Sequence, residues 1–304
     1  MKARFSVVSP RPIPGPLIAH VRQTIAAVDP HAVERGVKTV DLDALTWLFD
    51  VHESRLSMWK GSRELFTEEL RGPATALAVD SALITGKMAE GGPAAIVTDV
   101  DSTFITSEVI EMLAARAGVE EQVREITEAA MRGELEFAQS LGQRVGTLAG
   151  IPTTVFDDVF AEIQLTDGAQ RLVDAVHERG GRFCLVSGGF TEIVEKIAQR
   201  SGIDRFTANG LEVSDGALTG RTYGTVIDGG EKVAAIRRWE QEWEMDSQQV
   251  LCAGDGANDL PMMAHCGLGV AFMAKPIVLE NADCAINFPR LDAIAALVGW
   301  DIEN

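Results

Sequence analysis

Five short apolar runs alternate with helical patterns after about residue 90, and this order constrains the fold of the chain most strongly. The runs occupy residues 94–99, 182–187, 250–254, 267–271 and 284–286. Strands that are apolar on both faces and separated by helices are typical of a parallel sheet covered by helices on both sides. We therefore predict an α/β fold with a Rossmann-like parallel sheet.

Two stretches between these runs predict additions to the sheet. Residues 107–149 have helical spacing and are too long for a plain crossover, so we interpret them as an inserted helical cap over the sheet edge. Residues 207–222 contain the turn signals Asn209-Gly210 and Asp215-Gly216, which favour a β-hairpin. We expect the cap to open and close, because closure excludes bulk water from a site beneath it.

The first 88 residues follow a different pattern. Strand-like stretches at 5–8, 37–42, 45–51 and 76–83 and helical stretches at 17–27 and 63–70 give the order β-α-β-β-α-β. This order is typical of a small ferredoxin-like α+β sandwich. Residues 86–93 read GKMAEGGP and predict a linker. We therefore expect two domains, at 1–88 and 89–304.

The composition indicates an ordinary soluble globular protein and argues against two kinds of partner. Apolar residues make up 46% and charged residues 24% of the 304 residues, and the formal net charge is -18. Because so acidic a surface repels nucleic acid backbones and anionic membranes, we expect no nucleic acid and no membrane partner. No apolar run approaches the ~20 residues needed to span a bilayer, and no signal-peptide pattern follows Met1.

The cysteines predict the compartment. Cys184, Cys252, Cys266 and Cys284 form no C-x-x-C pair, and most lie in apolar runs. We interpret all four as buried free thiols rather than as zinc ligands or disulfides. Free thiols fit a reducing environment, so we expect a cytoplasmic protein.

Polar groups follow the first two predicted strands of the parallel sheet, at the edge where open α/β sheets bind ligands. Asp99 and Asp101 can both face the crevice, one as a nucleophile and the other as a general acid and base. Ser187 and Gly188 can hold phosphate oxygens through a hydroxyl and exposed amides. Taken singly, each group has a commoner structural explanation, namely an Asx-turn or a helix cap.

The third strand of that sheet is followed by a Gly-rich turn with Asp255, Asn258 and Asp259, and hard oxygen ligands of this kind suit Mg²⁺. Lys232 begins a helical run and can place its ammonium on a phosphate, although a solvated surface lysine is commoner. Three successive strand ends thus carry nucleophile-type, phosphate-type and metal-type groups. Their order favours a phosphoryl-transfer site.

The same residues resemble the four sequence motifs of the haloacid dehalogenase (HAD) superfamily, and the D-x-D-x-T form resembles its phosphatase branch. Residues 99–108, 128–144 and 254–264 further resemble the phosphoserine phosphatases of that superfamily. The resemblance implies a phosphoric monoester hydrolase that converts O-phospho-L-serine to L-serine and phosphate, the last step of serine biosynthesis. It also implies an aspartyl-phosphate intermediate and a Mg²⁺ cofactor, with Mn²⁺ as an alternative.

The resemblance implies a role for each matching residue. Asp99 would accept the phosphoryl group, and Asp101 would be the general acid and base. The metal would be held by Asp99, Asp255 and the backbone carbonyl of Asp101, with Asp259 orienting the metal site. The substrate-binding residues would be Glu108, Met131, Phe137, Arg144, Ser187, Gly188, Lys232 and Asn258. Among these, Glu108 would pair with the substrate ammonium and Arg144 with its carboxylate.

Several alternatives stay open. A related enzyme could act on another small phosphomonoester, or could transfer phosphate to an alcohol such as homoserine. A non-catalytic amino-acid-binding regulatory protein could keep the fold, although it would have no need of both Asp99 and Asp101. The strand order of residues 1–88 resembles ACT-type modules, which often bind amino acids and pair between chains. A regulatory domain, a homodimer contact and a purely structural role are therefore all compatible with these residues.

Overall fold

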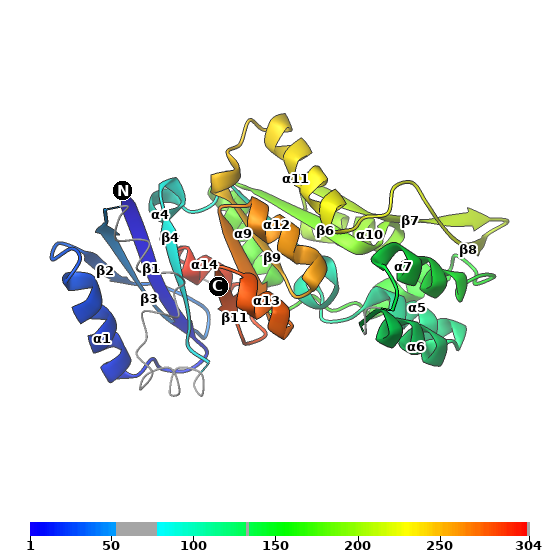
Figure 1. Ribbon diagram of the computed structural model, residues 1–304, viewed down its shortest axis with the longest axis horizontal. Coiled ribbons are helices and arrows are strands. Elements are labelled where there is room, and N and C mark those ends of the chain that lie inside the picture. The colour runs from blue at the N-terminus through cyan, green and yellow to red at the C-terminus, as the bar shows by residue number, and fades with distance from the viewer. Residues whose placement is uncertain (53–77, 132–133, 303–304) are drawn as a thin grey trace.

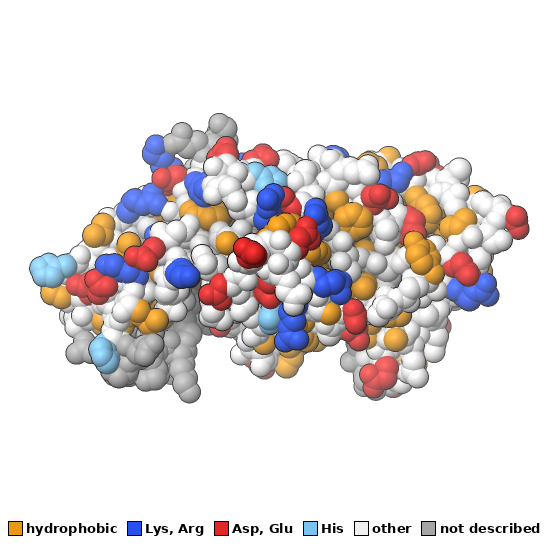
Figure 2. All heavy atoms as spheres, turned by 90° about the horizontal axis from the view of Figure 1, so that it is seen from above, with side chains coloured by type: hydrophobic (Ala, Val, Ile, Leu, Met, Phe, Trp, Pro, Cys, Tyr) orange, Lys and Arg blue, Asp and Glu red, His pale blue; other side chains and the backbone are white. Residues whose placement is uncertain are grey.

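The computed structural model describes residues 1–52, 78–131 and 134–302, apart from the side chain of Met131. Figure 1 shows an elongated molecule with an N-terminal sheet at one end, a large sheet in the middle and a helical cap at the other end. On the face seen in Figure 2, acidic and basic side chains are interspersed along the whole length. The net charge of -18 therefore does not gather into one acidic field on that face.

The central sheet has the order β11-β10-β9-β5-β6-β7-β8 among the described residues. All neighbours pair in parallel except β7 and β8, which form the predicted hairpin. The strands are β5 (Ala95–Thr98), β6 (Arg182–Phe190), β7 (Arg205–Ser214), β8 (Ala217–Tyr223), β9 (Val250–Gly254), β10 (Leu268–Phe272) and β11 (Cys284–Ile286). Every side chain of β5, β9, β10 and β11 is buried, because helices cover both faces. The α/β prediction is confirmed.

Helices pack on the two faces of this sheet through two separate apolar clusters. The helices are α9 (Ala169–Glu178), α10 (Thr191–Ser201), α11 (Gly229–Glu242), α12 (Leu260–His265), α13 (Pro276–Asn281) and α14 (Ala293–Leu297). On one face, α9 and α10 supply Leu172 and Ile193 to the larger cluster. On the other, α11 and α12 supply Ile236 and Met262 to the smaller one. The strand ends are thereby held in a rigid frame.

The cap is longer than the expected 107–149. It contains α5 (Val109–Ala117), α6 (Glu120–Met131), α7 (Phe137–Gly146) and α8 (Val155–Glu162). The chain leaves and re-enters the core through two segments joined by an antiparallel bridge between Ile105 and Leu165. At the far side, the Gly150 amide donates to the Leu218 carbonyl of β8 at 2.8 Å, which ties the cap to the hairpin.

The N-terminal sheet is antiparallel, with the order β2-β3-β1-β4. Its elements are β1 (Lys2–Ser9), α1 (Gly15–Ala26), β2 (Val33–Gly36), β3 (Asp43–Asp50) and β4 (Asp80–Thr85). One face packs on α1 through residues such as Phe5 and Leu17, and the other face packs against α14. The strand expected at 37–42 lies earlier in the chain, as β2. The helix expected at 63–70 lies outside the described residues, so the β-α-β-β-α-β order and the domain division stay predictions.

The segment expected to be a linker is instead a short helix, α4 (Lys87–Gly91), with Met88 and Ala89 buried. Gly86 and Gly92, which suggested flexibility in the sequence, have φ values of +68° and +81° and flank this helix. Glycine adopts such left-handed backbone without the steric cost of a Cβ. At Gly92 an added Cβ would also collide with the indole of Trp300, so the segment is packed rather than loose.

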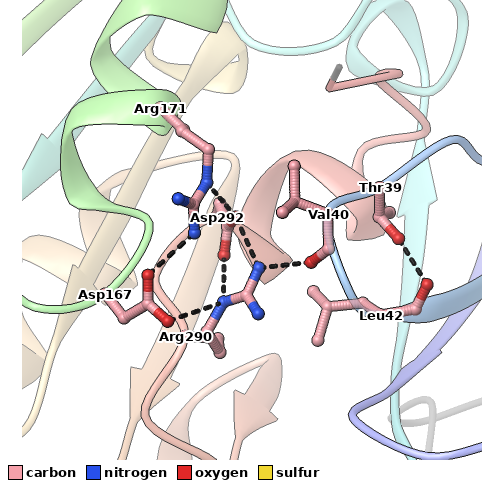
Figure 3. Close-up of polar contacts among 7 residues, drawn as sticks. All are labelled: Thr39, Val40, Leu42, Asp167, Arg171, Arg290 and Asp292. Carbon is pink, nitrogen blue, oxygen red and sulfur yellow. Dashed lines mark hydrogen bonds and ion pairs between the residues drawn. The ribbon is translucent and has the colours of Figure 1, made fainter. Parts of the chain in front are cut away.

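Several polar contacts join the N-terminal sheet to the rest of the chain. Asp80 accepts from the backbone and the side-chain amide of Asn287, at 2.6 Å and 2.5 Å. Figure 3 shows Arg290 between the two parts: its Nη2 donates to the Val40 carbonyl at 2.5 Å and to Asp292 Oδ2 at 2.9 Å. Asp292 also accepts from Arg171 at 2.9 Å. The N-terminal region is therefore held to the core by specific hydrogen bonds as well as by apolar packing.

The prediction that all four cysteines are free thiols is wrong, because Cys252 and Cys266 form a disulfide. The helix α12 runs back beside β9 and brings the two Cα atoms to 6.2 Å across a sequence separation of 14. Such a pairing depends on tertiary packing and leaves no local motif. Cys184 and Cys284 are buried thiols, as expected. Within the described ranges, no helix has the length and apolarity needed to cross a bilayer.

Candidate active site

A cavity of about 140 Å³ lies at the carboxyl ends of the central strands, between the core and the cap. Eight of the predicted site residues line it: Asp99, Asp101, Glu108, Phe137, Arg144, Gly188, Asp255 and Asn258. Ser187, Lys232 and Asp259 are fully buried in the adjoining core. Met131 ends α6, but its side chain lies outside the described part of the chain. Residues far apart in the sequence thus converge on one crevice, as the strand-end argument requires.

Beside the cavity, two buried carboxylates share one buried ammonium. Lys232 Nζ lies 2.7 Å from Asp99 Oδ1 and 2.6 Å from Asp259 Oδ1. Asp259 Oδ2 also accepts from the Gly256 amide at 3.0 Å. Burial favours the neutral form of Lys232, but the two carboxylates outweigh it and raise the pKa of the ammonium. If Asp99 and Asp259 are both ionised, the cluster carries one negative charge more than Lys232 neutralises, and burial together with the charge of Asp259 accordingly raises the pKa of Asp99.

That excess negative charge fits a bound cation. Carboxylate oxygens of Asp99, Asp255 and Asp259 lie within 4.8 Å of one another. Burial, followed by the charge of Asp259, raises the pKa of Asp255 to about 6. Clustered carboxylate oxygens are the ligands that Mg²⁺ and Mn²⁺ prefer. Because Asp259 is already engaged by Lys232 and Gly256, the predicted role of orienting the metal site suits it better than that of a ligand.

Asp101 is held apart from this carboxylate cluster. The tight turn Val100–Phe104 reverses the chain, with Ser102 in left-handed backbone at φ 55°, and returns the Val109 amide to Asp101. That amide donates to Asp101 Oδ1 at 2.8 Å, and Ser187 Oγ lies 3.5 Å from Oδ2. Burial, and then the charge of Glu108, raise the pKa of Asp101 to about 7. A carboxyl group with such a pKa can both donate and accept a proton near neutral pH.

Ser187 and Gly188, which we predicted to bind phosphate oxygens, lie in an irregular stretch of β6. The pairing of β6 with β7 shifts register between Val186 and Phe190, which frees the intervening residues from the regular ladder. Ser187 Oγ accepts from the Gly189 amide at 2.8 Å, and the Gly188 carbonyl accepts from Asn209 at 2.8 Å. A Cβ on Gly189 would lie 2.6 Å from Asp101 Oδ2. Glycine is therefore needed here to bring the loop close to the acid.

The cap supplies the two charged side chains that we expect to bind the ammonium and carboxylate of an amino acid. Glu108 precedes α5 and accepts from Ser102 Oγ at 2.8 Å. Arg144 lies in the last turn of α7, where burial lowers its pKa against the opposing effect of Glu108. Phe137, the first residue of α7, approaches Gly188, since a Cβ added to Gly188 would lie 3.0 Å from Phe137 Cζ. The cavity thus has a cap side with both an anion and a cation and a core side with the paired carboxylates.

The sequence reasoning missed six residues that line the cavity: Ile110, Leu141, Gly189, Phe190, Gly256 and Lys275. Five of them lie within two residues of a predicted residue or on the same helix face as one. Lys275 is different, because it follows β10, which corresponds to the fourth of the five apolar runs in the sequence. Its Nζ lies 3.7 Å from Asp255 Oδ2. The strand-end rule that found Asp99, Ser187 and Asp255 would have found it if applied to one more strand.

Comparisons with known proteins agree with this geometry. Residues 96–264, more than half of the chain, match the model of the haloacid dehalogenase-like hydrolases. A phosphoserine phosphatase of Streptococcus thermophilus is 50% identical over 196 residues, which cover 64% of this chain and 91% of that one. A phosphoserine phosphatase of Mycobacterium tuberculosis is 48% identical over 204 residues, which cover 67% of this chain but only 50% of that one. The chain therefore spans about half the length of the mycobacterial relative.

Solved structures extend the similarity to the fold. A substrate-bound phosphoserine phosphatase is 38% identical, with a TM-score of 0.63 over 66% of this chain and 95% of that one. A HAD family hydrolase of Salmonella enterica serovar Typhi covers 98% of both chains with a TM-score of 0.81, and at 23% identity it shows the fold alone. The chain belongs to the haloacid dehalogenase-like hydrolase family, and within that family it groups with the phosphoserine phosphatases.

Proposed function

We propose that the protein hydrolyses O-phospho-L-serine to L-serine and inorganic phosphate, the last step of serine biosynthesis, with Mg²⁺ as cofactor and Mn²⁺ as an alternative. The observation that carries this proposal is the pairing of two kinds of group in one cavity. Asp99 and Asp101 provide phosphoryl-transfer chemistry, while Glu108 and Arg144 line the same cavity on the cap side. Phosphoserine carries an ammonium, a carboxylate and a phosphate, so its recognition needs an anion, a cation and a phosphate site together.

The proposed reaction has two steps. Asp99 attacks phosphorus in line, the bond from phosphorus to the seryl oxygen breaks, and Asp101 donates its proton to that oxygen. Asp101 then takes a proton from a water molecule, which attacks the aspartyl-phosphate and releases phosphate. A cation held by Asp99 and Asp255 would supply the positive charge that lets a carboxylate approach a phosphate dianion. The pKa of about 7 that burial produces at Asp101 supports its two proton transfers.

Substrate binding completes the proposal. Arg144 would donate two hydrogen bonds to the substrate carboxylate, and Glu108 would accept hydrogen bonds from the ammonium. Phe137, Met131 and Asn258 would shape the rest of the pocket. Ser187, Gly188 and Lys232 would hold phosphoryl oxygens, and the hydrogen bonds that already orient Ser187 and Lys232 support this role.

A panel of phosphomonoesters tests the function. Phosphate release should be fastest with O-phospho-L-serine, slower with phosphoesters that lack the ammonium or the carboxylate, and abolished by EDTA until Mg²⁺ or Mn²⁺ is restored. Formation of phosphohomoserine when homoserine is added would instead point to phosphate transfer. Binding of serine without release of phosphate from any ester would point to a non-catalytic amino-acid-binding protein. Either result overturns the proposal.

A cytoplasmic location and a homodimer formed through the N-terminal domain are also proposals. The proposed substrate is a small charged metabolite of biosynthesis, which supports a cytoplasmic location, whereas the disulfide between Cys252 and Cys266 removes the argument from free thiols. Among the described strands of the N-terminal sheet, β2 is short, exposed and at one edge, which supports pairing between chains. Light scattering of the full chain tests the dimer, and a molar mass equal to one chain would exclude it.

A further inference from the structure

Lys275 lines the cavity, and none of the roles proposed above uses its positive charge. It lies between β10 and α13, and its Nζ is 3.7 Å from Asp255 Oδ2. Its backbone is fixed, because the Lys275 amide donates to the Asp255 carbonyl at 3.1 Å and Pro276 begins the helix. Its side chain is 58% exposed, so the ammonium can move while its Cα stays in place.

The other two cations near the proposed phosphate site, Lys232 and Arg144, are less free to bind a phosphoryl group. Lys232 is fully buried, and two of its three ammonium donors already bond to Asp99 and Asp259. Arg144 lies on the cap, where Glu108 is the carboxylate that acts most strongly to raise its pKa against the effect of burial. Among the described residues that line the cavity, Lys275 and Arg144 are the only cations, and they face four carboxylates, those of Asp99, Asp101, Glu108 and Asp255.

The distances allow Lys275 to reach a phosphoryl group. Carboxylate oxygens of Asp99 and Asp255 lie within 4.8 Å of each other, and Lys275 Nζ lies 3.7 Å from Asp255. Lys275 and Asp99 also line the same cavity, so a phosphoryl group beside Asp99 is accessible to the long and flexible side chain of Lys275. A cation that binds Asp255 would displace Lys275 from that carboxylate by charge repulsion.

We propose that Lys275 is a mobile phosphate-binding residue, which pairs with Asp255 in the cation-free site and turns to an outward-facing phosphoryl oxygen when a divalent cation occupies Asp255. The proposal rests on the proposed function, since it assigns a further binding contact to the same site. It predicts opposite effects of one substitution on two ligands. Lys275 would compete with the cation for Asp255 but would assist the phosphate.

Titration calorimetry on the full chain tests this with Mn²⁺ alone and with inorganic phosphate at saturating Mg²⁺. In Lys275→Met we expect Mn²⁺ to bind about two- to fivefold more tightly, because a competing charge is gone. We expect phosphate to bind about five- to tenfold more weakly, because a charge-assisted hydrogen bond is lost. Lys275→Arg should restore phosphate binding, since it keeps the charge. Lys2→Met is the matched control, because Lys2 is an exposed lysine that pairs with Asp50 far from the cavity.

Each other outcome overturns the proposal. Loss of affinity for both ligands in Lys275→Met would indicate a structural role, and unchanged affinity for phosphate would show that Lys275 does not touch it. Failure of the proposed function gives a different result, namely cation and phosphate binding by the parent protein without phosphate release from phosphoserine. Thermal unfolding of each variant, measured beside the parent, confirms that the compared proteins are folded.

Discussion

At the scale of single residues, the site is organised around an imbalance of buried charge. Asp99 and Asp259 share the ammonium of Lys232, and all three side chains are buried. Burying charge is unfavourable unless it is paired, and here one of the two carboxylates has no cation of its own. Ionising both carboxylates in this cluster is therefore unfavourable unless a further cation is bound, and the raised pKa of Asp99 reflects that cost. Function and stability should respond in opposite directions when that charge is removed.

Asp99→Asn tests this reasoning. The amide cannot attack phosphorus, so phosphate release from phosphoserine should fall by a factor of at least about 10³. In EDTA the variant should be more stable than the parent by on the order of 1 kcal/mol, because it relieves the repulsion between buried carboxylates. Urea unfolding with and without Mg²⁺ measures this, and the added stability should shrink when Mg²⁺ is present. Near-parental turnover, or a large loss of stability in EDTA, would contradict the assignment of Asp99.

At the scale of elements, sequence reasoning found what depends on local pattern and missed what depends on packing. The run at 250–254 became β9 and the run at 284–286 became β11 with the expected bounds, because strands buried on both faces are apolar throughout. The helix at Lys87–Gly91 and the disulfide were not foreseen. Glycines at 86 and 92 indicate a loop when read alone, and their role in flanking a buried helix emerges only from its contacts.

The candidate site shows the same division between local pattern and packing. The motifs at the strand ends predicted that Asp99, Asp101 and Asp255 lie close together, because parallel strands end at the same edge of a sheet. All three line one cavity. Motif spacing did not reveal how Asp259 is engaged, since that depends on Lys232 and on the Gly256 amide. Nor did it indicate Lys275, whose proximity to Asp255 follows from the adjacency of β9 and β10. The structure identifies the contact partners of each residue, and the spacing of motifs in the sequence does not.

The cap gives a prediction at this scale. Its two connections pair with each other, with the Thr106 amide donating to Gln164 and the Thr166 amide donating to Phe104. These bonds make a hinge that can stay formed while the helices beyond it move. On binding Mg²⁺ and inorganic phosphate, amide exchange in 109–146 should slow, while the hinge amides and those of β1 should exchange as before. Unchanged exchange throughout 109–146 would show that the cap does not close over the site.

At the scale of the whole molecule, the hinge of the cap is connected to the N-terminal sheet. Leu165 pairs with Ile105, and two residues later Asp167 accepts from Arg171 at 2.8 Å and pairs with Arg290 at 3.5 Å. Arg290 also donates to the Val40 carbonyl of the N-terminal region, as Figure 3 shows. One arginine therefore contacts both the loop between β2 and β3 and the segment through which the cap re-enters the core. This arrangement can couple the two ends of the molecule.

Arg290→Ala should disturb both ends, and Arg35→Ala is its matched control. Arg35 also joins the two parts, through Asp301 at 2.7 Å, but it does not contact Asp167. We expect Arg290→Ala to lower stability by about 1–3 kcal/mol, because Asp292 is buried and loses one of its two cationic partners. Amide exchange should quicken at 37–42 and at 164–168 together in this variant. In Arg35→Ala it should quicken at 33–38 and 299–302 and stay unchanged at 164–168. If Arg290→Ala leaves 164–168 as protected as in the parent, the hinge does not sense the N-terminal sheet, and the two ends of the molecule work independently.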